Sequence, residues 1–132
     1  MADGWTTAWA RNNLLRNVVK LDEYCLYCDT DSAKLKEGFN INVINEYNEG
    51  VLETIRKVSK DRGIPIERFS PKDKDGVEHT LGLFELDGVY SEFIHQGAKK
   101  YAYRKSKDNS MHITVSGVPK KRCKSIKKFR RF

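Results

Sequence analysis

The sequence YCLYCDTDSAKL, at residues 24–35, decides how this chain is expected to fold. An apolar run at 24–28 is followed by the short polar segment 29–32 and a second strand-like run, which is the pattern of two strands around a tight turn. Asp and Ser favour such turns because their side chains hydrogen-bond to nearby backbone groups. The first run is apolar at successive positions, so we expect it to be buried on both faces, in the middle of a sheet.

We expect a helix on either side of this hairpin. The first covers residues 5–20 and begins after Asp3, a residue type that commonly caps helix N-termini. The second covers residues 42–62, with Asn42 as its cap and Gly63 at its end. In both segments apolar residues recur every three or four positions, which predicts helices with one buried face.

The remaining chain is typical of antiparallel strands. Segments 81–86 and 89–94 flank the Asp-Gly pair at 87–88, which is a strong signal for a two-residue hairpin. Segments 98–104 and 111–116 follow, separated by a polar connection. The order of helix, hairpin, helix and meander predicts an α+β fold, in which two main helices pack on a mostly antiparallel sheet.

Composition places the chain among ordinary globular proteins. Its 132 residues suffice for one domain, and 39% are hydrophobic and 33% charged. No apolar run approaches the roughly 20 residues of a membrane span, so we expect no membrane association. The three cysteines are an odd number without an export signal, which favours reduced thiols and a cytoplasmic location. Cys25 and Cys28 lack a second pair at zinc-binding spacing, and on a strand they are expected to face opposite sides.

The net charge of +7 is distributed very unevenly. Residues 96–132 carry thirteen basic residues and one acidic residue, whereas the rest of the chain is acidic on balance. A concentrated basic segment indicates a polyanionic partner, most often nucleic acid. The alternative is a solvated basic tail, and charge alone leaves both interpretations open.

Asp29 and Asp31 stand two residues apart at the expected tip of the hairpin. Apolar strands would hold this tip firmly, so the two carboxylates would aim at a fixed point. Mg²⁺ prefers hard oxygen ligands and takes one or two protein carboxylates together with substrate phosphates. Two such ions stabilise the attacking and leaving oxygens of a phosphoryl displacement. The alternative is a solvated turn, which is the commoner explanation for an isolated Asp-x-Asp.

The segment YCDTDS at residues 27–32 resembles motif C of family B DNA polymerases, Tyr-x-Asp-Thr-Asp-Ser. Residues 7–11 resemble the Thr-Ala-x-Ala-Arg helix that precedes motif C, and residues 99–101 resemble the Lys-x-Tyr motif that follows it. Residues 112–121 are similar to the passage from palm to thumb. The resemblance is closest to phage and plasmid members, and residues 38–80 match no family motif.

This resemblance implies a palm subdomain over residues 1–117, with 118–132 as the truncated basic start of a thumb or a tail. The implied cofactor is Mg²⁺ in a two-metal site, and the implied partners are primer-template DNA and a deoxynucleoside triphosphate. Asp31 would be a ligand of both metals, and Asp29 would support the site. The implied roles of the other residues are shaping of the motif C turn by Tyr27, Thr30 and Ser32, and DNA or primer binding by Lys99, Lys100, Tyr101, Lys120 and Lys121.

The sequence departs from the family in two places. The catalytic Asp of motif A and the nucleotide-binding Lys of the fingers helix have no counterpart in these 132 residues. We therefore expect the metal site to be incomplete and the isolated chain to be inactive, as a cut-out of a larger enzyme, a gene remnant or one piece of a split enzyme.

Two other functions stay open. A non-catalytic nucleic-acid-binding module would use the basic C-terminal third, where aromatic residues are interleaved with the basic ones. A structural piece would dock onto a partner through Trp5 and Trp9. A palm sheet without its neighbours would expose apolar surface, so we also expect that the isolated chain can form a homodimer.

Overall fold

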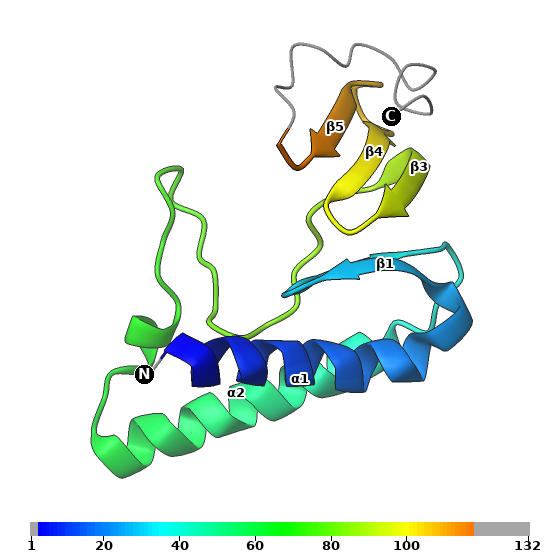
Figure 1. Ribbon diagram of the computed structural model, residues 1–132. Coiled ribbons are helices and arrows are strands. Elements are labelled where there is room, and N and C mark those ends of the chain that lie inside the picture. Colours follow the sequence, from blue (N-terminus) through cyan, green and yellow to red (C-terminus); the bar gives the residue numbers. More distant parts are fainter. Residues whose placement is uncertain (1–2, 118–132) are drawn as a thin grey trace. The chain divides into compact units, whose positions relative to one another are not determined.

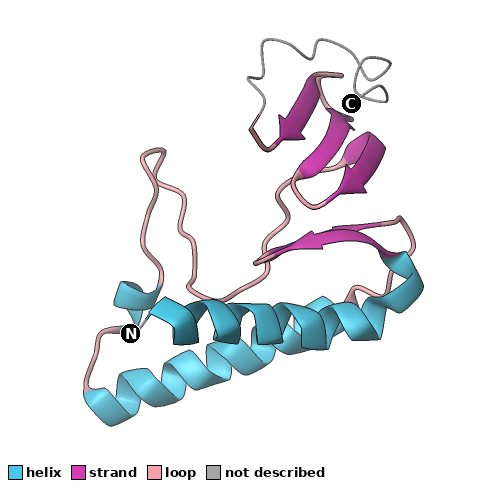
Figure 2. Cartoon of the chain, viewed as in Figure 1, coloured by secondary structure: helices cyan, strands magenta, loops and turns pink. Residues whose placement is uncertain are grey.

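The computed structural model describes residues 3–117, with side chains from residue 7 onward. The chain divides into two compact units, one ending at Glu85 and the other beginning at Leu86. Helices dominate the first unit, and the second unit contains only strands and turns in its described part (Figures 1 and 2). The α+β class and the antiparallel pairing predicted from the sequence are confirmed, but the strands form two separate sheets.

The first unit combines two long helices with one hairpin. α1 contacts both α2 and β2, and Figure 1 shows the helices side by side. The elements of this unit are α1 (Asp3–Leu21), η1 (Asp22–Tyr24), β1 (Cys25–Asp29), β2 (Ser32–Leu35), α2 (Asn42–Arg62) and η2 (Ile66–Phe69).

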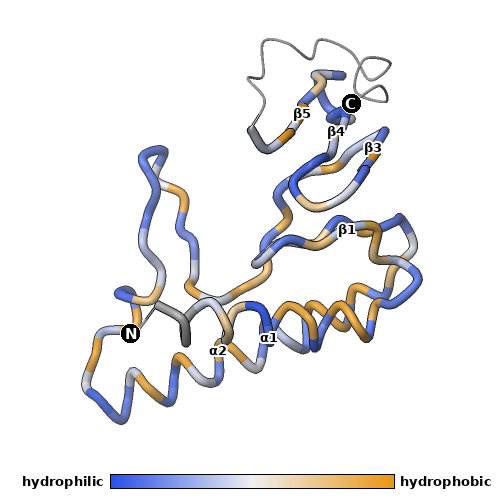
Figure 3. The backbone as a smooth tube through the Cα atoms, viewed as in Figure 1, coloured by the Kyte–Doolittle hydropathy of each residue, from blue (hydrophilic) through white to orange (hydrophobic). Residues whose placement is uncertain are grey.

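Each helix buries residues along one face, but the periodicity of the first helix misplaces that face. On α1 the buried residues are Leu14, Asn17 and Leu21, whereas Trp9, Leu15 and Val19, which the periodicity assigns to the core, are exposed. Figure 3 shows apolar and polar segments alternating along α1 and α2. Leu14 and Leu21 of α1 and Ile55 of α2 are buried, and they form the apolar core of this unit. Within the described residues, neither helix is long and apolar enough to cross a membrane.

The C-terminal end of α2 is where the sequence places it, whereas its N-terminal cap is different. Gly63 has a φ of 61°, and its N–H donates to the carbonyl of Ser59, which satisfies a terminal helix carbonyl. At the other end Asn42 is not the capping residue. Its own N–H donates to the side-chain oxygen of Asn40 over 3.1 Å. Two Asn residues flank the helix start at a spacing of two, so the sequence alone favours neither as the cap.

The hairpin of β1 and β2 forms at the predicted residues, but β1 does not lie in the middle of a sheet. In the described chain β1 pairs with β2 alone. Its residues are half-buried, except for Cys28, which is exposed. The prediction failed because an apolar run indicates burial without indicating what covers it. Here helix α1 contacts strand β2 of the hairpin, and β1 has no strand on its second edge in the described chain.

The second unit is a three-stranded antiparallel sheet in the order β3-β4-β5. Its strands are β3 (Tyr90–Gly97), β4 (Lys100–Lys105) and β5 (Met111–Val115). β3 and β4 are joined by a two-residue turn at Ala98 and Lys99, and Lys99 has a left-handed φ of 55°. On one face of the sheet, Ile94, Ile113 and Val115 pack against the fully buried Ala102.

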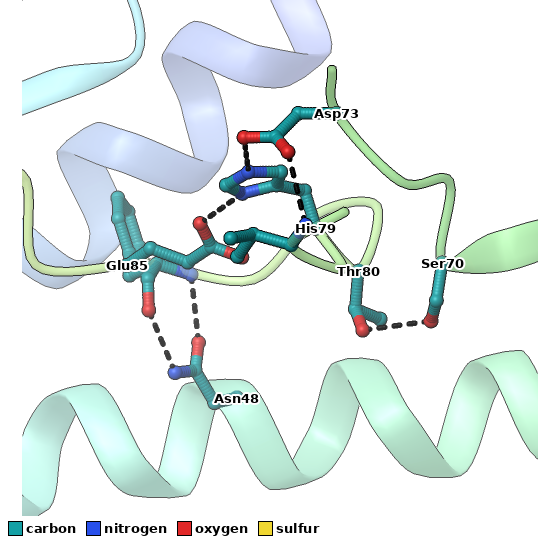
Figure 4. Close-up of polar contacts among 8 residues, drawn as sticks. Asn48, Ser70, Asp73, His79, Thr80 and Glu85 are labelled. Carbon is teal, nitrogen blue, oxygen red and sulfur yellow. Dashed lines mark hydrogen bonds and ion pairs between the residues drawn. The ribbon is translucent and has the colours of Figure 1, made fainter. Parts of the chain in front are cut away.

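The hairpin predicted around Asp87-Gly88 is wrong. Residues 81–89 contain no strand, and β3 pairs with β4 instead. The side chain of Asn48 on α2 takes the place of a neighbouring strand for Phe84: its oxygen accepts from the Phe84 N–H over 2.9 Å, and its nitrogen donates to the Phe84 carbonyl over 3.0 Å (Figure 4). The Tyr47 and Phe84 rings lie 4.9 Å apart. These contacts with α2 override the local turn signal.

Candidate functional site

The tip of the β1–β2 hairpin is an unusually tight turn. Asp29 pairs with Ser32 at the end of the ladder, and the N–H of Asp31 donates to the carbonyl of Asp29 over 2.6 Å. This bond closes a three-residue turn centred on Thr30, whose φ is 49°. A positive φ is uncommon for a β-branched residue, and three-residue turns of this form are rare and strained. Strain of this kind concentrates at functional sites.

The side chains of the turn bond to Asp29. The hydroxyl of Thr30 donates to Asp29 Oδ1 over 3.2 Å, and the hydroxyl of Ser32 donates to the Asp29 carbonyl over 3.4 Å. Asp29 is half-buried, whereas Asp31 is exposed. The turn therefore presents one oriented carboxylate and one that is open to solvent, two residues apart. Tyr27 lies half-buried on β1 and pairs with Lys34.

A bulge in β1 changes how its two thiols lie. The register of β1 against β2 shifts between Cys25 and Tyr27. Burial raises the pKa of the Cys25 thiol, and the neighbouring Cys28 raises this pKa further. Residues three apart on a regular strand face opposite sides, but the bulge adds a residue between Cys25 and Cys28 and brings their thiols close to each other. The expectation that these thiols point apart is therefore wrong.

The predicted DNA-binding residues of the described chain lie in the β3–β4 hairpin. Lys99 is in the turn, and its carbonyl accepts from the N–H of Ser116 over 3.1 Å. Lys100 pairs with Gly97 and is half-buried. Tyr101 is half-buried in the centre of the sheet, between β3 and β5. Lys120 and Lys121 lie outside the described residues.

The predicted site residues therefore form two groups. Asp29, Thr30, Asp31 and Ser32 meet in one turn of the first unit, whereas the Lys99–Tyr101 segment belongs to the second unit. The donor set of the turn fits Mg²⁺, which is held by one or two carboxylates with substrate phosphates supplying further oxygens. In the described part of the chain, His, Cys, Asp and Glu form no group of three or more that could hold a metal ion.

The first unit contains a second polar cluster, which the sequence did not indicate. The ring nitrogens of His79 lie 2.7 Å from Glu85 Oε2 and 3.3 Å from Asp73 Oδ2 (Figure 4). The hydrogen bond to Glu85 raises the pKa of His79, and the bond to Asp73 adds to this rise. Asp73 also accepts from the N–H groups of Val77 and Asp75, and the Val77 bond is the main cause of its lowered pKa.

A hollow of about 590 Å³ lies between α2 and residues 66–80. The hydroxyls of Ser70 and Thr80, 2.8 Å apart, lie on its wall. Arg56 and Lys72 line it together with Glu67 and Glu78, so its charges are mixed. None of the predicted site residues lines this hollow.

An aromatic face of the second unit was also missed as a group. Phe93 pairs with Tyr103 across β3 and β4, and His95 pairs with Tyr101. Tyr103 in turn pairs with His112 on β5. The signal in the sequence is an alternation, with rings at 93 and 95 and again at 101 and 103. No Ser or Cys stands near the histidines in a pattern that suggests a nucleophile, so the sequence indicates no catalytic role for them.

No protein-family model, curated protein or solved structure matches this chain.

Proposed function

We propose that this chain is a palm fragment of a family B DNA-directed DNA polymerase. The observation that carries the proposal is the strained turn at the tip of β1–β2, which presents Asp29 and Asp31 within the motif at residues 27–32. The order of the motif C-like and Lys-x-Tyr-like segments along the chain also supports it. The cysteine count favours a cytoplasmic setting for this activity.

In the complete enzyme the primer 3′-hydroxyl attacks the α-phosphorus of a deoxynucleoside triphosphate, and pyrophosphate leaves. Bound Mg²⁺ supplies charge neutralisation at the attacking and leaving oxygens. In this proposal Asp31, which is exposed on the turn, is the protein ligand of the bound Mg²⁺. Asp29 supports the site, and its carboxylate is oriented by the hydroxyl of Thr30.

Lys99 and Tyr101 are proposed to hold the primer strand near its 3′ end. A lysine ammonium grips phosphate without reading sequence, and Lys100, Lys120 and Lys121 add charge of the same sign. Tyr101 stands on a central strand with ladder partners on both sides, so its ring is held firmly. A rigid ring of this kind can pack on a sugar or base.

A graft tests this proposal directly. Residues 24–35 replace the motif C hairpin of a complete family B polymerase, and primer extension is measured. We expect the graft to retain extension and the graft carrying Asp31→Asn to lose about 10³-fold or more, because phosphoryl transfer depends on the charge at the metal site. The control is the same graft carrying Lys34→Gln, which removes a charge on β2 and keeps both carboxylates. Equal extension with and without Asp31→Asn would contradict the proposal.

The second candidate function is a non-catalytic nucleic-acid-binding module. The observation that favours it is the cluster of rings on β3–β5, flanked by Lys99 and Lys105. In that case Asp31→Asn leaves every function of the chain unchanged, and DNA affinity depends on the second unit. Measuring DNA binding of Asp31→Asn and of the second-unit variants side by side separates the two functions.

A further inference from the structure

We propose that the aromatic face of β3–β5 binds single-stranded nucleic acid by stacking unpaired bases on its rings. We call this face the ring platform; it consists of Phe93, His95, Tyr101, Tyr103 and His112. The inference deepens the proposed nucleic-acid contacts of the second unit, and it does not depend on Asp29 or Asp31.

The two faces of this sheet are chemically different. Ladder pairs place Ala102 opposite Ile94 and Ile113, and these residues build the aliphatic core. The neighbouring ladder pairs put the rings on the opposite face, because side chains alternate along each strand. The core that stabilises the unit is therefore aliphatic, and the rings are concentrated on the other face.

The rings are arranged as a continuous series. Tyr103 and His112 are nearly parallel, at an angle of 11° with centroids 5.1 Å apart. Tyr101 and Tyr103 are stacked at 17° and 6.3 Å. Phe93 lies 6.0 Å from Tyr101 and 6.1 Å from His95. The Tyr90 ring also packs against Tyr103, with centroids 4.5 Å apart. Rings that stack on one another present outer faces at the two ends of the series, at His95 and His112, and unpaired bases can extend the stack there.

Cross-strand ring pairs also stabilise sheets, so the series by itself does not require a ligand. Exposure makes the second role possible here. His95 and His112, at two edges of the ring platform, are exposed, and the three other rings are only half-buried. The ring platform is therefore accessible to a ligand.

Charge complementarity selects nucleic acid as the occupant. Lys105 ends β4 at a position in step with Tyr101 and Tyr103, and Lys99 lies in the turn that precedes this strand. Residues 96–132 carry thirteen basic residues against one acidic residue. Eight of these thirteen residues lie outside the described part of the chain; the described ones are Lys99, Lys100, Arg104, Lys105 and Lys107. Lysines together with aromatic rings are the combination that binds single strands, where phosphates contact lysines and bases contact aromatic faces.

The rings favour a single strand over a duplex. Bases in a duplex are already stacked and paired, so their faces are not available to protein rings. The lysines contribute to binding of both forms, because they contact phosphate regardless of pairing. The difference in affinity between single strand and duplex therefore measures the contribution of the ring platform.

The test uses the full chain and fluorescence anisotropy with labelled 20-nucleotide probes: oligodeoxythymidylate, oligouridylate and a DNA duplex of equal length. We expect the single strands to bind about tenfold or more tightly than the duplex at the same salt concentration. His112→Ala and Tyr101→Leu should each weaken single-strand binding about tenfold and leave duplex binding unchanged. The matched control is His79→Ala, an exposed histidine of the first unit, which should change neither.

Two outcomes of the binding measurements would overturn the proposal. One is equal affinity for single strand and duplex, which would assign binding to charge alone. The other is unchanged single-strand binding in both variants. Chemical-shift mapping on the unmodified chain guards against misfolded variants: oligodeoxythymidylate should shift the resonances of Tyr103 and His112, and shifts confined to other residues would contradict the inference. Failure here leaves the Asp31 graft result untouched, so the two proposals stand or fall separately.

Discussion

Thr30 is the residue on which the geometry of the candidate metal site depends most. Its backbone is left-handed, and its hydroxyl bonds to the Asp29 carboxylate. A left-handed backbone costs an ordinary residue about 1–2 kcal/mol, less for Asn because its short polar side chain bonds locally. The turn therefore carries a local cost that a different residue would reduce.

We expect Thr30→Asn to increase the free energy of unfolding by about 0.5–1 kcal/mol. Urea denaturation measures the change. The matched control is Thr54→Asn in α2, where the backbone is helical and the two residue types have similar propensity, so the change should be near zero. Destabilisation by Thr30→Asn would show that the turn is not strained.

His79 makes the first unit sensitive to pH. Its pKa is raised above the ordinary value by Glu85 first and then by Asp73. Between the unfolded and the folded pKa, the native state binds more protons than the unfolded state. Stability contributed by this residue is thus fully present below the unfolded pKa and is lost as pH rises through the folded pKa.

We expect the urea midpoint of the wild type to fall as pH rises from about 6 to about 8, the range that brackets an ordinary histidine. His79→Ala should flatten this dependence. His95→Ala is the control, since His95 lies in the second unit, and it should keep the fall. Parallel pH profiles for the wild type and His79→Ala would contradict this account.

At the scale of elements, Asn48 holds the segment that follows the 73–79 loop against α2. Its amide satisfies both backbone groups of Phe84. Removing it leaves a part-buried N–H and carbonyl without their partner, which costs about 1–3 kcal/mol.

We expect Asn48→Ala to lower the free energy of unfolding by about that amount and to speed hydrogen exchange at the Phe84 amide. Asn45→Ala, at an exposed position of the same helix, should change stability by no more than about 0.5 kcal/mol. If both variants lose the same stability, then Asn48 acts through helix propensity and not through Phe84.

The elements also show what the sequence could predict. Apolar periodicity located both long helices, and the turn chemistry at residues 29–32 located the first hairpin. The Asp-Gly pair at 87–88 failed because local turn chemistry competes with long-range partners, and Asn48 is distant in sequence. The tight turn that carries Asp29 and Asp31 was predictable, whereas the left-handed Thr30 was not, since a β-branched residue rarely adopts that backbone.

At the scale of the whole molecule, the strands divide between two compact units, where one sheet was expected. Strand patterns predict which residues form strands, but they do not predict which strands pair. The division of the strands into two sheets was therefore not predictable from the sequence. The ring platform was missed for the same reason. Its members come from three strands, and only their pairing brings them onto one face.

The exposed apolar residues of α1 predict self-association. Trp9 and Val19 are 69% and 73% exposed, and Leu15 is 46% exposed. We expect the sedimentation coefficient of the full chain to rise with concentration, and Val19→Lys to weaken this association about tenfold or more. Arg11→Lys, on the same helix, should leave it unchanged. A concentration-independent monomer would contradict this prediction.

The central claim is that the 29–32 turn binds a divalent cation through Asp31. Paramagnetic broadening of amide resonances by substoichiometric Mn²⁺, used as a probe for Mg²⁺, tests it most directly on the full chain. We predict that broadening is strongest at residues 28–32, that Asp31→Asn abolishes it there, and that Asp75→Asn in the other acidic turn leaves it in place. Broadening that is equal at both turns, or that survives Asp31→Asn, would contradict the account.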